Sequence, residues 1–132
     1  MKVKHEIIVR EYNDGNKEIL VFSNQAEYDP LWFFLNYEVG QFEEWIKENL
    51  QGVILTQEEK TISGNICTAI ITPTRTTIID NFAGEAGKEI DRCVVDTRKL
   101  LRAVNWWSDF VREWKRTGEK DSIHGTTGEL DL

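Results

Sequence analysis

The stretch DPLWFFLNYEVGQFEEWIKENLQG, residues 29–52, decides how the rest of the chain folds around it. Aspartate and proline, at positions 29 and 30, are residue types that begin helices. The apolar residues that follow recur every three or four positions, which is the period of one helix face. They are Leu31, Leu35, Val39, Phe42, Ile46 and Leu50. The pattern predicts a helix over about residues 30–50. A second interpretation starts the helix near Val39, with residues 31–37 extended, because Gly40 weakens a helix by roughly 1 kcal/mol relative to alanine.

Segments on both sides of this helix are rich in β-branched residues, the composition of strands. We predict strands at about 2–12 and 17–23, joined through Asp14-Gly15, a dipeptide typical of hairpin turns. The stretches 61–72 and 76–82 form a second predicted hairpin around Pro73. Residues 91–95 add one more short strand. A second helix is predicted over 97–116, begun by Asp96-Thr97 and ended before Gly118.

The element order β-β-α-β-β-β-α predicts a single α+β domain over residues 1–117. We expect a mostly antiparallel sheet of four to five strands with both helices packed on one face. The alternative arrangement places the helices at opposite edges. Residues 118–132 are polar and are expected to form a C-terminal tail, either mobile or wrapped over the sheet. The predicted core residues are Leu35, Phe42, Ile46, Ile66, Ile70, Ile78, Val94, Leu101, Val104 and Val111.

The composition is that of an acidic globular protein. The 132 residues carry a formal charge of −7, which argues against direct binding to nucleic acid, where cations must meet phosphate. The longest apolar run, residues 31–35, is far shorter than the roughly 20 residues that cross a membrane. The N-terminal residues lack the apolar segment of a signal peptide, so we expect a cytoplasmic protein without a membrane partner. Cys67 and Cys93 are expected to be buried free thiols.

Motifs that carry chemistry are missing from the sequence. The two histidines, His5 and His124, lie outside any cluster with metal-ligand spacing, and there is no glycine-rich phosphate loop. Cys93 stands shortly before a predicted helix and beside Arg92, a weak sign of an activated thiol, but no histidine is placed to act as its base. The sequence therefore predicts a protein that is not an enzyme, with no catalytic residues, no cofactor and no metal.

Residues 27–59 account for the entire net charge, with eight acidic residues against one base, Lys47. Glu44 and Glu48 are four positions apart and share a helix face, where like charges repel by a few tenths of a kcal/mol. Such a region is either an ordinary solvated surface, a docking surface for a basic protein, or a metal or catalytic cluster. The residues that we predict to contact a partner are Glu38, Glu43, Glu44, Glu48, Glu58 and Glu59.

Aromatic residues suggest an anchor for such a partner. Trp106 and Trp107 are adjacent, so that only one of them can face the core fully. Trp106 is thus a candidate exposed anchor, with burial under the tail or against the sheet edge as the alternative. Trp32, beside the apolar stripe of the first helix, is the second candidate.

Three stretches resemble segments of a known group of proteins: residues 38–46 (EVGQFEEWI), 63–67 (SGNIC) and 93–101 (CVVDTRKLL). Together they cover about a fifth of the chain. They resemble small acidic bacterial proteins associated with secreted or contact-dependent toxins, the immunity proteins, which comprise many unrelated folds. The resemblance implies a cytoplasmic inhibitor that binds a toxin, often a basic nuclease domain, and blocks its active site. It assigns no catalytic residues.

The sequence thus predicts a protein-binding module, an immunity-type inhibitor that docks a basic toxin domain through the acidic region. Two alternatives remain open at this point. One is a small-ligand or sensor domain with an aromatic pocket, and the other is a small enzyme that uses glutamates or Cys93.

Overall fold

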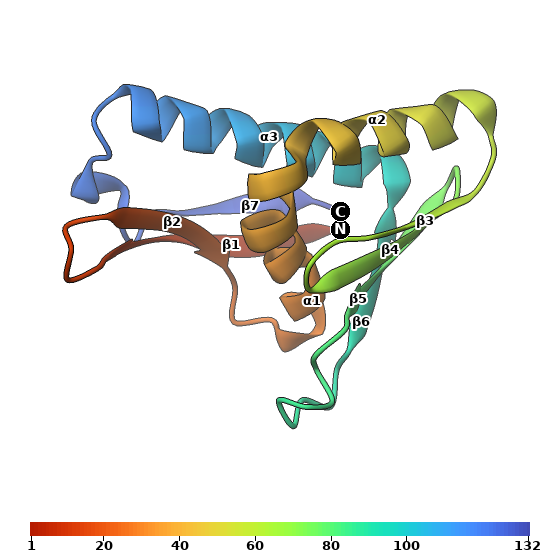
Figure 1. The fold of residues 1–132 in the computed structure, drawn as a ribbon, viewed down its shortest axis with the longest axis horizontal. Helices are drawn as coiled ribbons and strands as arrows, with labels where there is room; N and C mark the ends of the chain where they lie inside the picture. The colour runs from red at the N-terminus through yellow and green to blue at the C-terminus, as the bar shows by residue number, and fades with distance from the viewer.

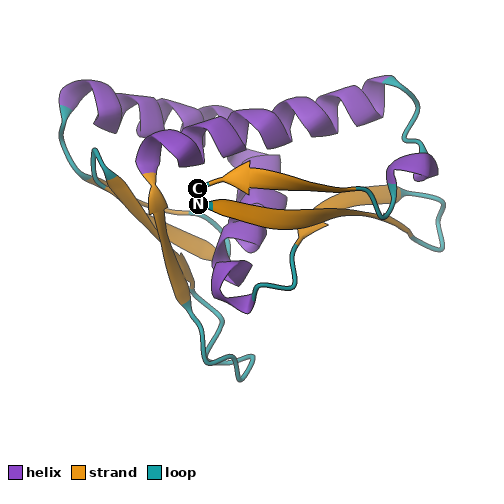
Figure 2. Ribbon diagram, turned by 180° about the vertical axis from the view of Figure 1, so that it is seen from behind, coloured by secondary structure: helices purple, strands orange, loops and turns teal.

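The computed structural model describes residues 1–132 and has two antiparallel sheets set beneath a layer of helices (Figure 1). The three-stranded sheet and the four-stranded sheet diverge from one another, and the first helical segment lies between them. The two long helices, α2 (Gly40–Thr56) and α3 (Thr97–Arg116), run side by side across the top of both sheets (Figure 2). None of the helices combines the length and the apolar composition needed to cross a membrane.

The three-stranded sheet has the order β2-β1-β7, with β1 (Lys2–Glu11) in the centre. Its neighbours are β2 (Lys17–Phe22) and β7 (Thr127–Asp131), which pair with different halves of β1. Alternate residues of β1 are buried, namely Val3, His5 and Ile7. This alternation is typical of a sheet with one covered face.

The four-stranded sheet has the order β3-β4-β5-β6, with every strand antiparallel to the next. Its strands are β3 (Lys60–Ser63), β4 (Cys67–Ile71), β5 (Arg75–Asp80) and β6 (Arg92–Asp96). One cross-strand row runs from Ile62 through Ala69 and Ile78 to Cys93, and all four side chains are buried. This row forms the covered face of the sheet.

The segment between the sheets is helical from Ala26 to Thr56 but not uniformly α-helical. A short 3₁₀ turn (Ala26–Tyr28) leads into α1 (Asp29–Phe33), which is followed by a π-helical segment, η2 (Phe34–Val39), and then by α2. Phe42 departs from helical geometry, with φ −124° and ψ 32°. Helix α1 contacts β2, β5 and β6, so its apolar residues fill the space between the two sheets. Leu31, Trp32 and Leu35 are fully buried there.

Helix α3 begins at an aspartate cap, because the Asp96 side chain accepts a hydrogen bond of 2.9 Å from the backbone N–H of Lys99. Its buried face is centred on Leu100, Ala103, Val104 and Trp107. A 3₁₀ turn (Asp121–Ile123) then reverses the chain into β7.

The structure confirms the predicted α+β class with antiparallel pairing. It distributes the strands over two sheets, whereas one sheet was expected. Two sheets take the place of the expected single sheet of four to five strands, because β1 pairs with β7 and the 29–39 helical segment separates it from β3–β6. The segment 118–132, expected as a tail, contributes η3 (Asp121–Ile123) and strand β7. Two predicted core residues, Ile70 and Val94, are instead 37% and 54% exposed. They lie on the uncovered face of the four-stranded sheet.

Candidate protein-binding surface

Helix α2 separates its apolar and polar residues onto opposite sides. Ile46, Leu50 and Val53 recur at helical spacing and are buried against the core. The opposite side carries Glu44 and Glu48, both exposed. At about 1.5 Å of rise per residue, these two glutamates lie about 6 Å apart along the helix axis. Burial of the apolar side therefore fixes the direction in which the acidic side faces.

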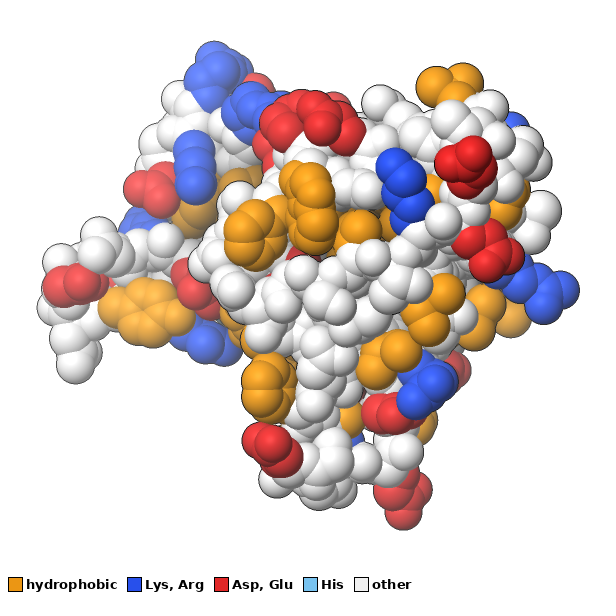
Figure 3. Space-filling model, turned by 45° about the vertical axis from the view of Figure 1, so that its right-hand side comes forward, with side chains coloured by type: hydrophobic (Ala, Val, Ile, Leu, Met, Phe, Trp, Pro, Cys, Tyr) orange, Lys and Arg blue, Asp and Glu red, His pale blue; other side chains and the backbone are white.

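Four of the predicted acidic contact residues are exposed and unpaired. Glu44 and Glu48 lie on α2, and Glu58 and Glu59 lie in the connection to β3. None of the four side chains takes part in a salt bridge or a hydrogen bond. We call this set the free carboxylates. Figure 3 shows acidic side chains beside hydrophobic ones in the upper part of the molecule, where α2 lies in Figure 1.

Glu43 faces the neighbouring helix rather than solvent. Its Oε1 atom lies 2.8 Å from Lys47 Nζ and 2.7 Å from Arg112 Nη2, so the carboxylate joins α2 to α3. The hydrogen bond from Lys47, supported by Arg112, lowers the pKa of Glu43 to about 2. Because two cations already surround this carboxylate, Glu43 adds little negative potential to the surface.

Glu38 is buried, with only 1% of its surface exposed. Its Oε1 atom accepts hydrogen bonds from the backbone N–H groups of Asn65, at 3.0 Å, and Ile66, at 3.1 Å. The side chain thus fastens the π-helical segment to the β3–β4 turn. It contributes packing and hydrogen bonds inside the molecule and offers no exposed carboxylate to a partner.

The two tryptophans expected as anchors are both engaged in internal packing. Trp32 is fully buried, and its indole N–H donates to Ser23 Oγ at 3.2 Å. Trp106 is half-buried, with its ring centroid 4.8 Å from that of His5 and 5.7 Å from that of Phe110. Neither residue lies with the free carboxylates on α2.

Trp45 is the exposed tryptophan on this surface, and sequence reasoning did not select it. Its side chain is 42% exposed, directly after Glu44 and three residues before Glu48. Its ring meets that of Phe42 edge-on, with centroids 6.1 Å apart. The sequence did carry a signal: Trp45 lies outside the apolar stripe, between two glutamates spaced i and i+4.

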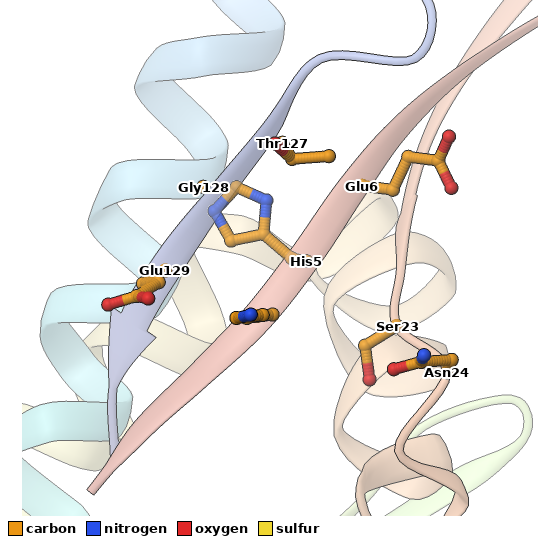
Figure 4. A pocket seen from close by; sticks show the side chains of 8 residues that line it. His5, Glu6, Ser23, Asn24, Thr127, Gly128 and Glu129 are labelled. Carbon is orange, nitrogen blue, oxygen red and sulfur yellow. The ribbon is translucent and has the colours of Figure 1, made fainter.

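The four main cavities of the molecule lie away from Trp32 and Trp45. The largest of the four, of about 500 Å³, is lined by eight residues from β1, β7 and the loop after β2, none of them hydrophobic (Figure 4). Another cavity, of about 330 Å³, lies between α2 and α3, beside Leu55, Leu101 and Arg102. Neither Trp32 nor Trp45 lines any of the four main cavities.

The remaining chemistry-bearing residues are dispersed. Burial raises the pKa of the Cys93 thiol to about 11, which is the opposite of the change that activates a nucleophilic cysteine. Cys67 is also a buried free thiol whose pKa is raised by burial. No three side chains of His, Cys, Asp or Glu are grouped so that they could hold a metal ion.

Together, the fold and the surface describe an α+β protein with unpaired carboxylates on α2 and in the connection to β3, and with an exposed tryptophan next to Glu44 on α2. The chain is similar to a curated protein from Bacillus cereus named "Immunity protein". The two are 36% identical over 103 residues, which make up 77% of this chain and 86% of that protein. The chain belongs to the family of this immunity protein. No family model matches the chain, and no solved structure matches it.

Proposed function

We propose that this protein is an immunity-type inhibitor that binds a basic toxin domain through the free carboxylates Glu44, Glu48, Glu58 and Glu59. The observation that carries the proposal is that these four side chains are exposed and have no cation within the molecule. Glu43, by contrast, is paired with Lys47 and Arg112. Membership of this immunity protein's family supports the role of an inhibitor. The unpaired negative charges favour a partner that is basic.

Charges at such a surface act mainly on the rate of encounter. A basic partner is drawn toward a set of carboxylates over about one Debye length, 8 to 10 Å at physiological salt. Complementary charge can raise the association rate constant by orders of magnitude at low salt. An inhibitor gains from this, because it must reach its toxin before the toxin reaches a target.

The proposal makes the protein a binding protein rather than an enzyme and places its action in the cytoplasm. Support for the compartment comes from Cys67 and Cys93, both of which are free thiols. Reduced cysteines are the rule in reducing compartments. The toxin domain would be one that acts there, and the inhibitor would cover the site with which the toxin engages its target.

The test begins with a search for a toxin gene next to the gene of this chain. The toxin domain found there is purified and titrated against the inhibitor at several salt concentrations. We expect the variant Glu44→Gln/Glu48→Gln to lower the association rate constant roughly three- to tenfold at low salt, with the difference fading at high salt. The matched control is Glu85→Gln/Glu89→Gln, which removes the same charge from two exposed residues of the β5–β6 loop. Equal effects of the two variants would show that only net charge matters and would remove α2 as the docking surface.

A further inference from the structure

Trp45 differs from the other four tryptophans of the chain. Trp32, Trp107 and Trp114 are at most 4% exposed, and Trp106 packs against His5 and Phe110. Trp45 is 42% exposed, and its indole N–H has no hydrogen-bond partner. Tryptophan is the side chain most strongly enriched among residues that dominate binding energy at interfaces.

The ring of Trp45 has an aromatic neighbour on one side. Phe42, half-buried against the core, supports it edge-on at 6.1 Å between centroids. The backbone carbonyl of Trp45 accepts a hydrogen bond of 2.8 Å from Asn49 Nδ2 within α2. A side chain whose range of positions is limited by a neighbour loses less conformational entropy when a partner arrives.

The surroundings of Trp45 indicate the chemistry of what would contact it. Glu44 is its neighbour in sequence, Glu48 lies one turn further along α2, and neither carboxylate has a cation partner. A partner group that sits over the indole ring therefore also sits beside two negative charges. A cation meets this description best, because ammonium and guanidinium groups are attracted to the face of an indole ring, the strongest aromatic acceptor of this kind.

We propose that Trp45 is the affinity anchor of the docking surface and seats an arginine or lysine side chain of the basic partner over its ring, flanked by Glu44 and Glu48. This inference rests on the proposed function and adds to it the residue that holds the complex together. The carboxylates govern how fast the complex forms, and Trp45 governs how slowly it dissociates.

The experiment measures association and dissociation rate constants with the same toxin domain for Trp45→Ala, Trp45→Leu and Trp45→Phe. We expect Trp45→Ala to raise the dissociation rate constant roughly thirtyfold while the dependence of association on salt stays unchanged. Trp45→Phe keeps an aromatic face, so it should lose less affinity for the toxin domain than Trp45→Leu. The control is Tyr12→Ala, which removes an aromatic ring of similar exposure, 44%, from the β1–β2 hairpin.

Each outcome decides between the two proposals. If the wild-type protein binds the toxin domain and Trp45→Ala dissociates at the wild-type rate, the anchor is overturned and the docking function stands. Equal losses of affinity for Trp45→Leu and Trp45→Phe would overturn the proposal that a cation sits over the ring, because an apolar contact does not require an aromatic face. A wild-type protein that does not bind the toxin domain overturns both. Circular dichroism and thermal unfolding of each variant separate lost binding from lost folding.

Discussion

The carboxylate of Glu38 occupies the space in which a side chain at Gly64 would stand. A Cβ atom added at Gly64 would overlap Glu38 Oε2, while Glu38 Oε1 accepts the backbone N–H groups of Asn65 and Ile66. The π-helical segment and the β3–β4 turn are thus locked together by one glutamate and one glycine. Substituting either residue should weaken the contact between the β3–β4 turn and the π-helical segment that leads into α2.

The first prediction concerns this lock. Gly64→Ala is expected to lower the free energy of unfolding by about 2 kcal/mol or more, since the added methyl group displaces a buried carboxylate. Glu38→Ala is expected to cost about 1–3 kcal/mol, because it leaves two backbone N–H groups without their acceptor. Urea denaturation measures both. Gly84→Ala is the control, since a Cβ there meets open space. Equal stability of the two alanine-for-glycine variants would contradict the lock.

The second prediction concerns the pH dependence given by Glu43. Its pKa is lowered from 4.5 to about 2 by Lys47 and Arg112, so its stabilisation is fully present above pH 4.5 and is lost as the pH falls toward 2. Glu43→Gln should therefore lower the free energy of unfolding by about 1 kcal/mol at pH 7, a value reduced for partial exposure. The difference from wild type should vanish near pH 2. Glu48→Gln, which breaks no ion pair, should show no such dependence.

The third prediction concerns His5, which packs between Trp106 and Gly128 with its Nδ1 atom buried and without a hydrogen bond. Burial lowers the pKa of His5 below its ordinary value of 6.5. The unfolded chain therefore takes up a proton at a higher pH than the folded protein does, and stability falls as the pH drops below 6.5. His5→Phe keeps a ring against Trp106 and cannot titrate. Between pH 7 and pH 5, the free energy of unfolding should fall less in this variant than in the wild-type protein. Parallel curves of unfolding free energy against pH would contradict this prediction.

The fourth prediction concerns Gln57, which ends α2 in the left-handed conformation with φ 64° and ψ 15°. Glycine adopts this conformation without steric cost and is the usual residue at such a position. We expect Gln57→Gly to raise the free energy of unfolding by about 0.5 kcal/mol. The gain from glycine in the left-handed conformation is partly offset, because the hydrogen bond from Gln57 Nε2 to the Ile54 carbonyl is lost. Gln51→Gly, on the exposed side of the same helix, should lower it by about 1 kcal/mol. A decrease for both variants would contradict the prediction.

Elements governed by local signals were predictable from the sequence. The predicted helix over 97–116 coincides with α3, because Asp96 caps it and Gly118 follows it. The first hairpin is also as expected around Asp14-Gly15. Strand β7 was not foreseen, since Thr127–Asp131 has little β composition and is held by pairing with β1 at the other end of the chain. The division into two sheets follows from that long-range pairing.

The candidate site was predictable in its charge but not in its detail. The sequence identifies the acidic region, yet it cannot tell the buried Glu38 or the paired Glu43 from the exposed Glu48. That difference is produced by the β3–β4 turn and by Arg112, both distant in sequence. Trp45 could have been found from its position outside the apolar stripe, although Phe42, three residues earlier, departs from helical geometry.

The position of β1 as the central strand of the three-stranded sheet has a consequence for how the protein folds during synthesis. Half of β1 can pair with β2 once the first hairpin has left the ribosome, but Lys2–Glu6 must wait for residues 127–131. Contacts this far apart in sequence slow folding, and an unpaired strand edge can meet other chains in the meantime. The sheet on which Trp106 and α3 pack therefore closes only once residue 131 has emerged, and until then the nascent protein keeps an open edge.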